Sequence, residues 1–212
     1  MHSTFHTTEY DRRRTIAPEI PTARRRTIAR TATRTQMSTP DPRDDLAQHL
    51  REDHRLILDA LQILESLAER IGLGYRFPAE ATAIVLRFFR EYVERVHHDR
   101  EATWLYPQAL ALGTDADVAL VGELAREHDD TKLLLHTLTL LWEPEVDLTT
   151  DEREQFATIA KTYAARLRRH VEQEDRHLVP LLAGRCDDAH VEERGRTEWR
   201  RALQRLDDVV AD

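Results

Sequence analysis

The chain has 212 residues, enough for one domain with a sizeable core, and 41% of them are hydrophobic and 33% charged. No apolar run approaches the ~20 residues that span a membrane, and the single cysteine, Cys186, excludes an intramolecular disulfide, so we expect a cytoplasmic protein. Residues 1–40 contain eight Arg and three acidic residues, which gives them a net charge of +5. Because the whole chain has a net charge of −8, the other 172 residues have a net charge of −13. This acidic body argues against nucleic acid as a partner.

Residues 1–40 are rich in Thr and Arg and show no apolar periodicity, and the segment Arg12–Ala17 recurs as Arg24–Ala29. Such a composition buries too little apolar surface to order itself, so we interpret the segment as a disordered tail. A translation start at Met37 fits the same features. The functional alternative is a basic arm for an acidic partner or a targeting segment.

The first predicted helix begins at Asp41–Pro42, which has the residue types of a helix N-cap and first helical position. Apolar residues then recur at helical spacing as far as Ala68. After a loop that contains two glycines, a proline opens a second predicted helix over residues 78–113.

A third helix is predicted over about residues 115–142, and a fourth over residues 149–184, where Thr149 and Glu152 form a capping box. Four long helices joined by short loops predict an all-α, up-down-up-down bundle over residues 41–184.

A shorter fifth helix is predicted within the C-terminal segment 185–212, over about residues 188–210. Its apolar stripe could cap the bundle or meet a second subunit, and we favour packing onto its own bundle. The stripe consists of Trp199, Leu203, Leu206 and Val210.

Two copies of one motif carry the candidate chemistry. His97-x-x-x-Glu101 and His170-x-x-x-Glu174 lie 73 residues apart, and Leu-x-Pro follows each of them. Residues i and i+4 of a helix share a face, so each motif presents an imidazole and a carboxylate together. Nitrogen and oxygen donors of this kind suit iron, manganese or zinc.

Two further His residues complete the pattern, because His54 and His128 lie mid-helix, 74 residues apart, in the first and third predicted helices. Antiparallel neighbours can bring all four imidazoles to one depth of the bundle. Burying them with two carboxylates would cost several kcal/mol per charge as an order of magnitude, and metal coordination removes that cost. The pattern therefore predicts a metal site.

In this order and spacing the motifs resemble the hemerythrin-like, or HHE cation-binding, family over about residues 42–183. The resemblance implies a bundle that holds two non-heme iron ions, bridged by carboxylates and by an oxo or hydroxo group. It implies that each ion takes one His from a single-His helix and one from a paired helix. Ferritin-like bundles use Glu-x-x-His instead, a spacing that the chain lacks.

Two positions depart from the oxygen-carrying members of the family. Lys132 stands where they have a second His in the third helix, and their fourth helix has His-x-x-x-x-Asp. Asp175 keeps that older spacing, but on a regular helix Glu174 points closer to His170, so we favour Glu174 as the ligand. Lys132 either approaches an anionic ligand of the metals or extends outward to solvent.

The resulting set of four His and two Glu resembles the branch that contains the iron–sulfur repair di-iron proteins, although residues 1–40 have none of the cysteines of the N-terminal domain usual in that branch. It implies a protein of stress response or iron homeostasis that binds, senses or reacts with O2, peroxide or nitric oxide, with a catalase-like activity among the options. The alternatives are iron or oxygen storage without turnover, and a regulatory module whose binding to a partner depends on the metal. We interpret Tyr106 as a packing residue and His98 as either exposed or just outside the ligand set.

Overall fold

The computed structural model describes residues 46–142, 148–183 and 193–211. The predicted tail and the predicted helix start at Asp41–Pro42 lie outside the described residues. The helices are α1 (Leu46–Gly72), α2 (Ala79–Phe88), η2 (Phe89–His97), α3 (His98–Arg100), η3 (Glu101–Leu105), α4 (Tyr106–Leu112), α5 (Asp115–Leu141), α6 (Thr150–Gln173), η4 (Glu174–Leu178), η5 (Val179–Leu182) and α7 (Glu193–Ala211).

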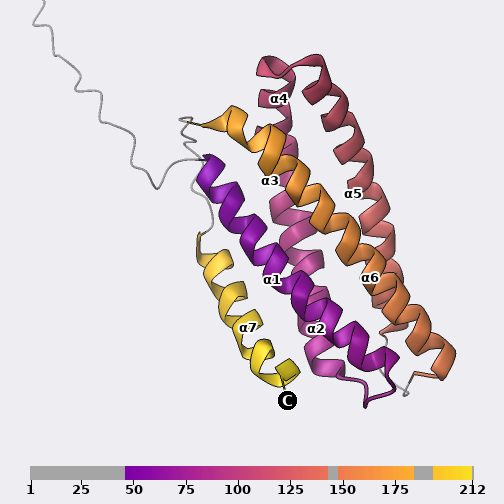
Figure 1. The fold of residues 1–212 in the computed structure, drawn as a ribbon. Coiled ribbons are helices and arrows are strands. Elements are labelled where there is room, and N and C mark those ends of the chain that lie inside the picture. The colour runs from indigo at the N-terminus through magenta and orange to yellow at the C-terminus, as the bar shows by residue number, and fades with distance from the viewer. Residues whose placement is uncertain (1–45, 143–147, 184–192, 212) are drawn as a thin grey trace, which may run out of the picture. The chain divides into compact units, whose positions relative to one another are not determined.

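These elements form four long rods, because α2 to α4 run on as one helix and α6 continues into η4 and η5 (Figure 1). The predicted up-down-up-down bundle is confirmed: α1 packs along α6, α5 packs along α6, and the start of α1 meets η5 at the far end of the fourth rod. The predicted capping box of Thr149 and Glu152 is present, and Thr114 with Asp117 makes a second one at the start of α5.

Two of the rods widen into π-helix near the ligand motifs. The π-helical segments η2 and η3 flank His98–Arg100, and η4 begins at Glu174. Pro107 and Pro180 each follow a π-turn by two residues. A proline lacks the N–H of a regular helix and its ring presses on the preceding turn, and a wider turn accommodates both effects. The repeated Leu-x-Pro thus accompanies a local widening of each motif helix.

The apolar core consists of two clusters with a polar layer between them. Along α1 one cluster ends at Leu50 and the other begins at Leu56, and along α5 the corresponding limits are Leu124 and Leu135. The gap in every rod is filled by buried or partly buried polar side chains. They are Asp53, His54, His97, His98, Glu101, His128, Thr131, His170 and Glu174.

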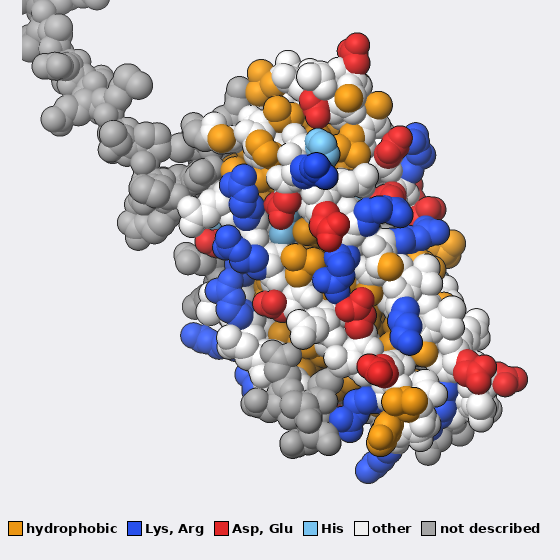
Figure 2. All heavy atoms as spheres, viewed as in Figure 1, with side chains coloured by type: hydrophobic (Ala, Val, Ile, Leu, Met, Phe, Trp, Pro, Cys, Tyr) orange, Lys and Arg blue, Asp and Glu red, His pale blue; other side chains and the backbone are white. Residues whose placement is uncertain are grey.

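Helix α7 lies along α1 and α2, as the sequence predicted for its apolar stripe (Figure 1). Leu203 and Leu206 are buried and Trp199 packs against Phe88, whereas the side chain of Val210 lies outside the described residues. Within the described ranges, no helix is long and apolar enough to span a bilayer. Acidic and basic side chains are interspersed over the face shown in Figure 2.

Candidate metal centre

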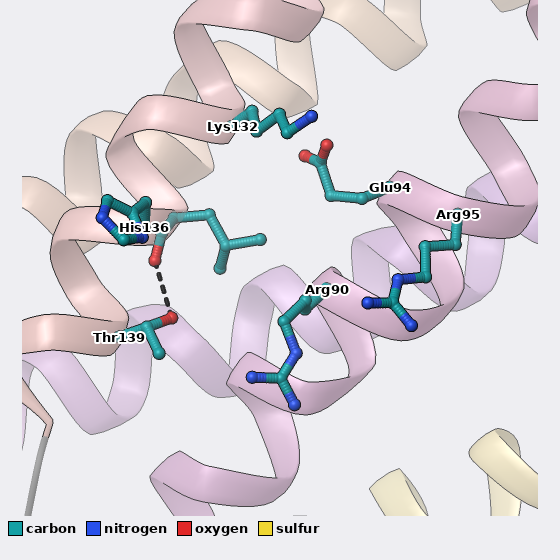
Figure 3. A pocket seen from close by; sticks show the side chains of 7 residues that line it. Arg90, Glu94, Arg95, Lys132, His136 and Thr139 are labelled. Atoms are coloured by element: carbon teal, nitrogen blue, oxygen red, sulfur yellow. Dashed lines mark hydrogen bonds between the residues drawn. The ribbon is translucent and has the colours of Figure 1, made fainter.

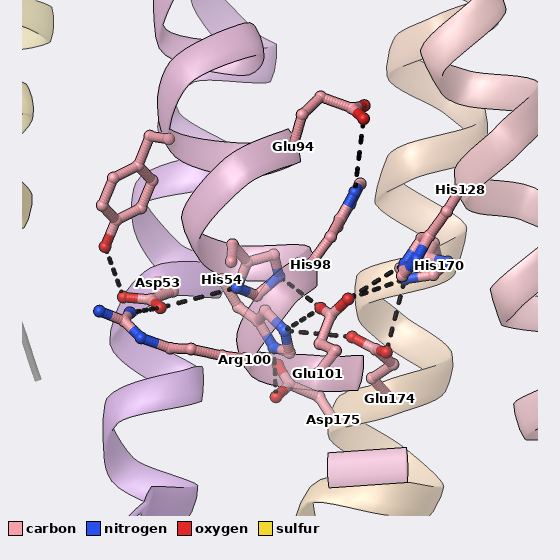
Figure 4. A network of polar contacts seen from close by, with 12 residues as sticks. Asp53, His54, Glu94, His98, Arg100, Glu101, His128, His170, Glu174 and Asp175 are labelled. Atoms are coloured by element: carbon pink, nitrogen blue, oxygen red, sulfur yellow. Dashed lines mark hydrogen bonds and ion pairs between the residues drawn. The ribbon is translucent and has the colours of Figure 1, made fainter. Parts of the chain in front are cut away.

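The six predicted ligand side chains converge in the polar layer from all four rods (Figure 4). Five of them are 0–1% exposed, and the sixth, His128, is 17% exposed. They are His54 from α1, His97 from η2, Glu101 from η3, His128 from α5, His170 from α6 and Glu174 from η4.

Glu101 lies between two pairs of imidazoles and turns one oxygen toward each pair. Its Oε1 is 2.6 Å from Nε2 of His97 and 4.0 Å from Nε2 of His54. Its Oε2 is 3.0 Å from Nε2 of His128 and 4.0 Å from Nε2 of His170. One carboxylate therefore faces both halves of the centre.

Glu174 repeats this arrangement from the opposite side. Its Oε2 is 3.3 Å from Nε2 of His54, and its Oε1 is 3.4 Å from Nε2 of His170. The hydroxyl of Tyr106 donates to the same Oε1 at 3.1 Å and lies 3.2 Å from Nε2 of His128. Tyr106 is therefore more than the packing residue that we predicted, since its hydroxyl belongs to the centre.

The donor atoms lie close enough together to share metal ions. Donors bound at about 2.1 Å to one ion lie at most about 4.2 Å apart, and every separation above is within that limit. The Nε2 atoms of His128 and His170 are 3.1 Å apart, and donors of His54, His97, Glu101 and Glu174 all lie within 4.8 Å of one another.

Several of these atoms are buried without a hydrogen bond to the described part of the chain. They are Nε2 of His54, Nε2 of His97, both carboxylate oxygens of Glu101 and Oε2 of Glu174. Buried polar atoms are rarely left unsatisfied because each costs about 1–3 kcal/mol. A cation between each imidazole pair and the two carboxylates would satisfy all of them.

Three of the four imidazoles have a carboxylate on their outer side. Nδ1 of His54 is 2.8 Å from Asp175, Nδ1 of His170 is 3.4 Å from Glu127, and Nδ1 of His97 is 3.6 Å from Asp53, longer than a normal hydrogen bond. An acceptor at Nδ1 keeps the proton there and leaves Nε2 free to bind a metal. Asp175 thus sits behind His54, away from the inner carboxylates.

In the protein without bound metal, the charged groups of the centre strongly shift one another's pKa values. Burial by itself lowers the pKa of His97, but Glu101 and Asp53 outweigh it and raise the pKa to about 10. Burial also lowers the pKa of His170, but the nearby carboxylates of Glu174, Glu127 and Glu101 outweigh this effect and raise that pKa to about 10. Although burial would raise the pKa of Glu101, the neighbouring imidazoles hold it well below its usual range. A metal that binds here must displace protons.

The outer carboxylates Asp53 and Glu127 were not predicted, although the sequence contains a signal for them. Each immediately precedes a single His, and they lie 74 residues apart like His54 and His128. Each serves the paired His of another rod, His97 and His170 respectively. Sequence spacing within one helix cannot reveal this, because the contact crosses between helices.

His98 is 7% exposed and is therefore buried, which rules out the exposed alternative for this residue. Its ring stacks on that of His128 with centroids 3.8 Å apart and planes 12° apart. Although His98, Glu101 and His128 offer donors within 4.8 Å of one another, a metal lies in the plane of each imidazole that binds it. Two parallel rings at this separation cannot share one ion, so His98 positions the ring of His128.

Lys132 lines a pocket of about 390 Å³ between η2 and α5, together with Glu94 and Arg95 among others (Figure 3). The Lys132 side chain is exposed and extends toward Glu94 in Figure 3, so the outward alternative describes it better. Glu94 connects the pocket to the centre, because its carboxylate is 3.8 Å from Nδ1 of His98.

Comparison with known families gives a match to the model described as the hemerythrin HHE cation binding domain, over residues 45–182. The matched region includes all six converging side chains and ends before α7. Neither the comparison with curated proteins nor that with solved structures found a match.

Proposed function

The chain belongs to the hemerythrin HHE cation-binding domain family, and we propose that it is a non-heme di-iron protein that binds, senses or reacts with O2, peroxide or nitric oxide. His54 and His97 would hold one ion and His128 and His170 the other. Glu101 and Glu174 would bridge the two. Manganese and zinc suit the same donors and are the alternative metals.

The observation that carries this proposal is the orientation of the two inner carboxylates. Each of them turns one oxygen toward the first imidazole pair and the other oxygen toward the second pair. A carboxylate that served one ion would have no reason to face both pairs. Two buried carboxylates in this orientation support a dinuclear centre over two separate ions.

The donor count supports reaction at the metals in addition to storage. With two His nitrogens and two carboxylate oxygens from the chain, each iron ion would keep exchangeable positions at which a small oxygen or nitrogen ligand could bind. Lys132 takes the place of a further His and lines the pocket beside Glu94, so it adds no donor. Tyr106 offers an O–H beside Glu174 and His128, and burial with the nearby carboxylates raises the pKa of its hydroxyl and keeps it protonated.

Metal analysis with optical spectroscopy tests the proposal. Protein from iron-replete cells should contain close to two iron ions per chain and show a charge-transfer absorption that changes with peroxide. Catalytic loss of peroxide would favour reaction, and stable iron without turnover would favour storage or carriage. Full iron content in both the His54→Ala and Glu174→Ala variants would refute the ligand assignment. An iron-free wild-type protein would contradict the di-iron proposal and leave only another metal or the regulatory module.

A further inference from the structure

Helix α7 lies beyond the region that matches the family, yet one of its side chains reaches the layer of the metal centre. Its apolar residues dock the helix on the bundle, where Leu203 is buried and the ring of Trp199 lies 5.6 Å from that of Phe88. Arg196 extends from the same helix into the protein and is 2% exposed. A guanidinium buried to this extent needs anionic partners.

Two adjacent acidic residues of α1 provide those partners. Nε of Arg196 donates to Oδ1 of Asp53 at 2.8 Å, and its Nη1 donates to Glu52. Its Nη2 also donates to the backbone carbonyl of His49 at 3.4 Å. Arg196 thereby fixes the N-terminal turn of α7 to the turn of α1 that directly precedes His54.

Asp53 in turn stands behind a predicted metal ligand. It is fully buried and also accepts from the hydroxyl of Tyr92 at 2.7 Å and from Arg100. Its Oδ2, which accepts from Arg100, lies 3.6 Å from Nδ1 of His97, and Figure 4 shows Asp53 beside the Arg100 guanidinium. A continuous line of polar contacts thus runs from α7 through Asp53 and His97 to Glu101.

We infer that α7 is coupled to the metal centre and that Arg196 is a positioning residue, which holds Asp53 behind His97 so that docking of α7 and metal binding strengthen each other. This inference rests on the proposed function. If metal binding tightens the docking of α7, thermodynamic linkage requires α7 to tighten metal binding by the same factor. Any event that separates α7 from the bundle would then lower the affinity for the ion bound by His97.

The second half of the centre provides the matched comparison. There Glu127, the counterpart of Asp53, is paired at 2.5 Å with Arg169, which is 59% exposed and belongs to α6 itself. An exposed pair of this kind contributes little because water and salt screen it. Arg169→Met therefore controls for loss of an arginine behind a ligand, and exposed Arg200 in α7 controls for a change in α7 alone.

The experiment measures Fe²⁺ affinity by competition with a chelator, together with amide hydrogen exchange of α7, on the full chain. Arg196→Met should lower the affinity for one of the two Fe²⁺ ions about 10- to 100-fold, as loss of support behind a metal ligand generally does. Arg196→Lys should restore part of the loss, and Arg169→Met and Arg200→Met should change affinity by less than about 3-fold, as expected for exposed arginines. In the wild type, Fe²⁺ should slow exchange in α7, and in the Arg196→Met variant it should not.

Normal Fe²⁺ affinity in a folded Arg196→Met variant would overturn the coupling and leave the di-iron proposal intact. If that variant does not fold, the wild-type exchange decides, and α7 exchange that does not respond to Fe²⁺ overturns the coupling. A wild-type chain that binds no Fe²⁺ would overturn both proposals.

Discussion

The two halves of the centre share one sequence pattern but have different surroundings. In the first half, His54 and His97 are almost fully buried, and fully buried Asp53 lies behind His97. In the second half, His128 is 17% exposed and Glu127, behind His170, is 21% exposed. The repeat places Ala102 where the other motif has Asp175, so His128 has no equivalent of the carboxylate that serves His54.

This difference suggests a division of labour between the halves. A sealed half with anchored ligands would hold an ion tightly, whereas an open half with a less constrained His would admit an external ligand and exchange its ion more easily. Loss of a side chain that faces both halves should abolish this contrast.

The largest effect should come from Glu101→Gln, because Glu101 faces both halves. An amide keeps the shape of the side chain but is a much poorer metal ligand than a carboxylate. We expect iron content to fall from about two ions per chain to well below one, measured by elemental analysis, with helical circular dichroism as the folding control. Retention of both ions would show that Glu101 does not bridge them.

Two single variants, each lacking one imidazole from a different half, should distinguish the metal binding of the two halves. His128→Ala should leave about one ion per chain, held in the sealed half, and chelator should remove it slowly. His97→Ala should leave an ion that chelator removes at least about 10-fold faster, because it sits in the half with fewer outer carboxylates. Equal release rates from the two variants would contradict the division of labour.

Replacing an outer carboxylate by an amide should also weaken metal binding, but by less than the loss of an imidazole. Asp175→Asn weakens the 2.8 Å contact to Nδ1 of His54, so Fe²⁺ affinity should fall about 10-fold or more. Glu127→Gln changes a longer and partly solvated contact, and we expect a decrease of only a few-fold. Chelator competition measures both, and a larger loss in the Glu127 variant would reverse the predicted order.

The smallest predicted effect concerns pH and should involve both halves alike. His97 and His170 have pKa values raised to about 10 in the protein alone, against about 6.5 in an unfolded chain. Their contribution to stability is therefore complete below pH 6.5 and is lost as pH rises toward 10. The Tm of chelator-treated protein should therefore fall as the pH rises from 6.5 to 9.5.

The iron-loaded protein provides the control for the pH prediction. There protons compete with the metal for the same nitrogens, so acid should lower its Tm. A chelator-treated protein whose Tm rises from pH 6.5 to 9.5 would contradict the raised pKa values.

The sequence predicted the bundle because helical periodicity, capping residues and short loops agree along the whole described chain. It also predicted which six side chains meet, since repeats of 73 and 74 residues bring equivalent positions to one layer of antiparallel helices. It did not predict the π-turns at the motifs. A wider turn forms where proline and packing act together, and spacing alone does not show this.

The groups around the ligands were harder to predict for a different reason. Asp53 and Glu127 support imidazoles on other helices, and Arg196 arrives from α7, beyond the region of the repeat. Such contacts depend on the rotation and depth of neighbouring helices, which are set by packing of the whole core. The hydroxyl of Tyr106 illustrates the same limit, because an amphipathic side chain packs its ring and bonds through its tip.

Anaerobic titration of the metal-free protein with Fe²⁺ tests the central claim most directly, namely that the six side chains form one dinuclear centre. We predict saturable binding with an endpoint at two ions per chain, the first bound more tightly than the second. An endpoint at one ion per chain, or no saturable binding, would contradict it.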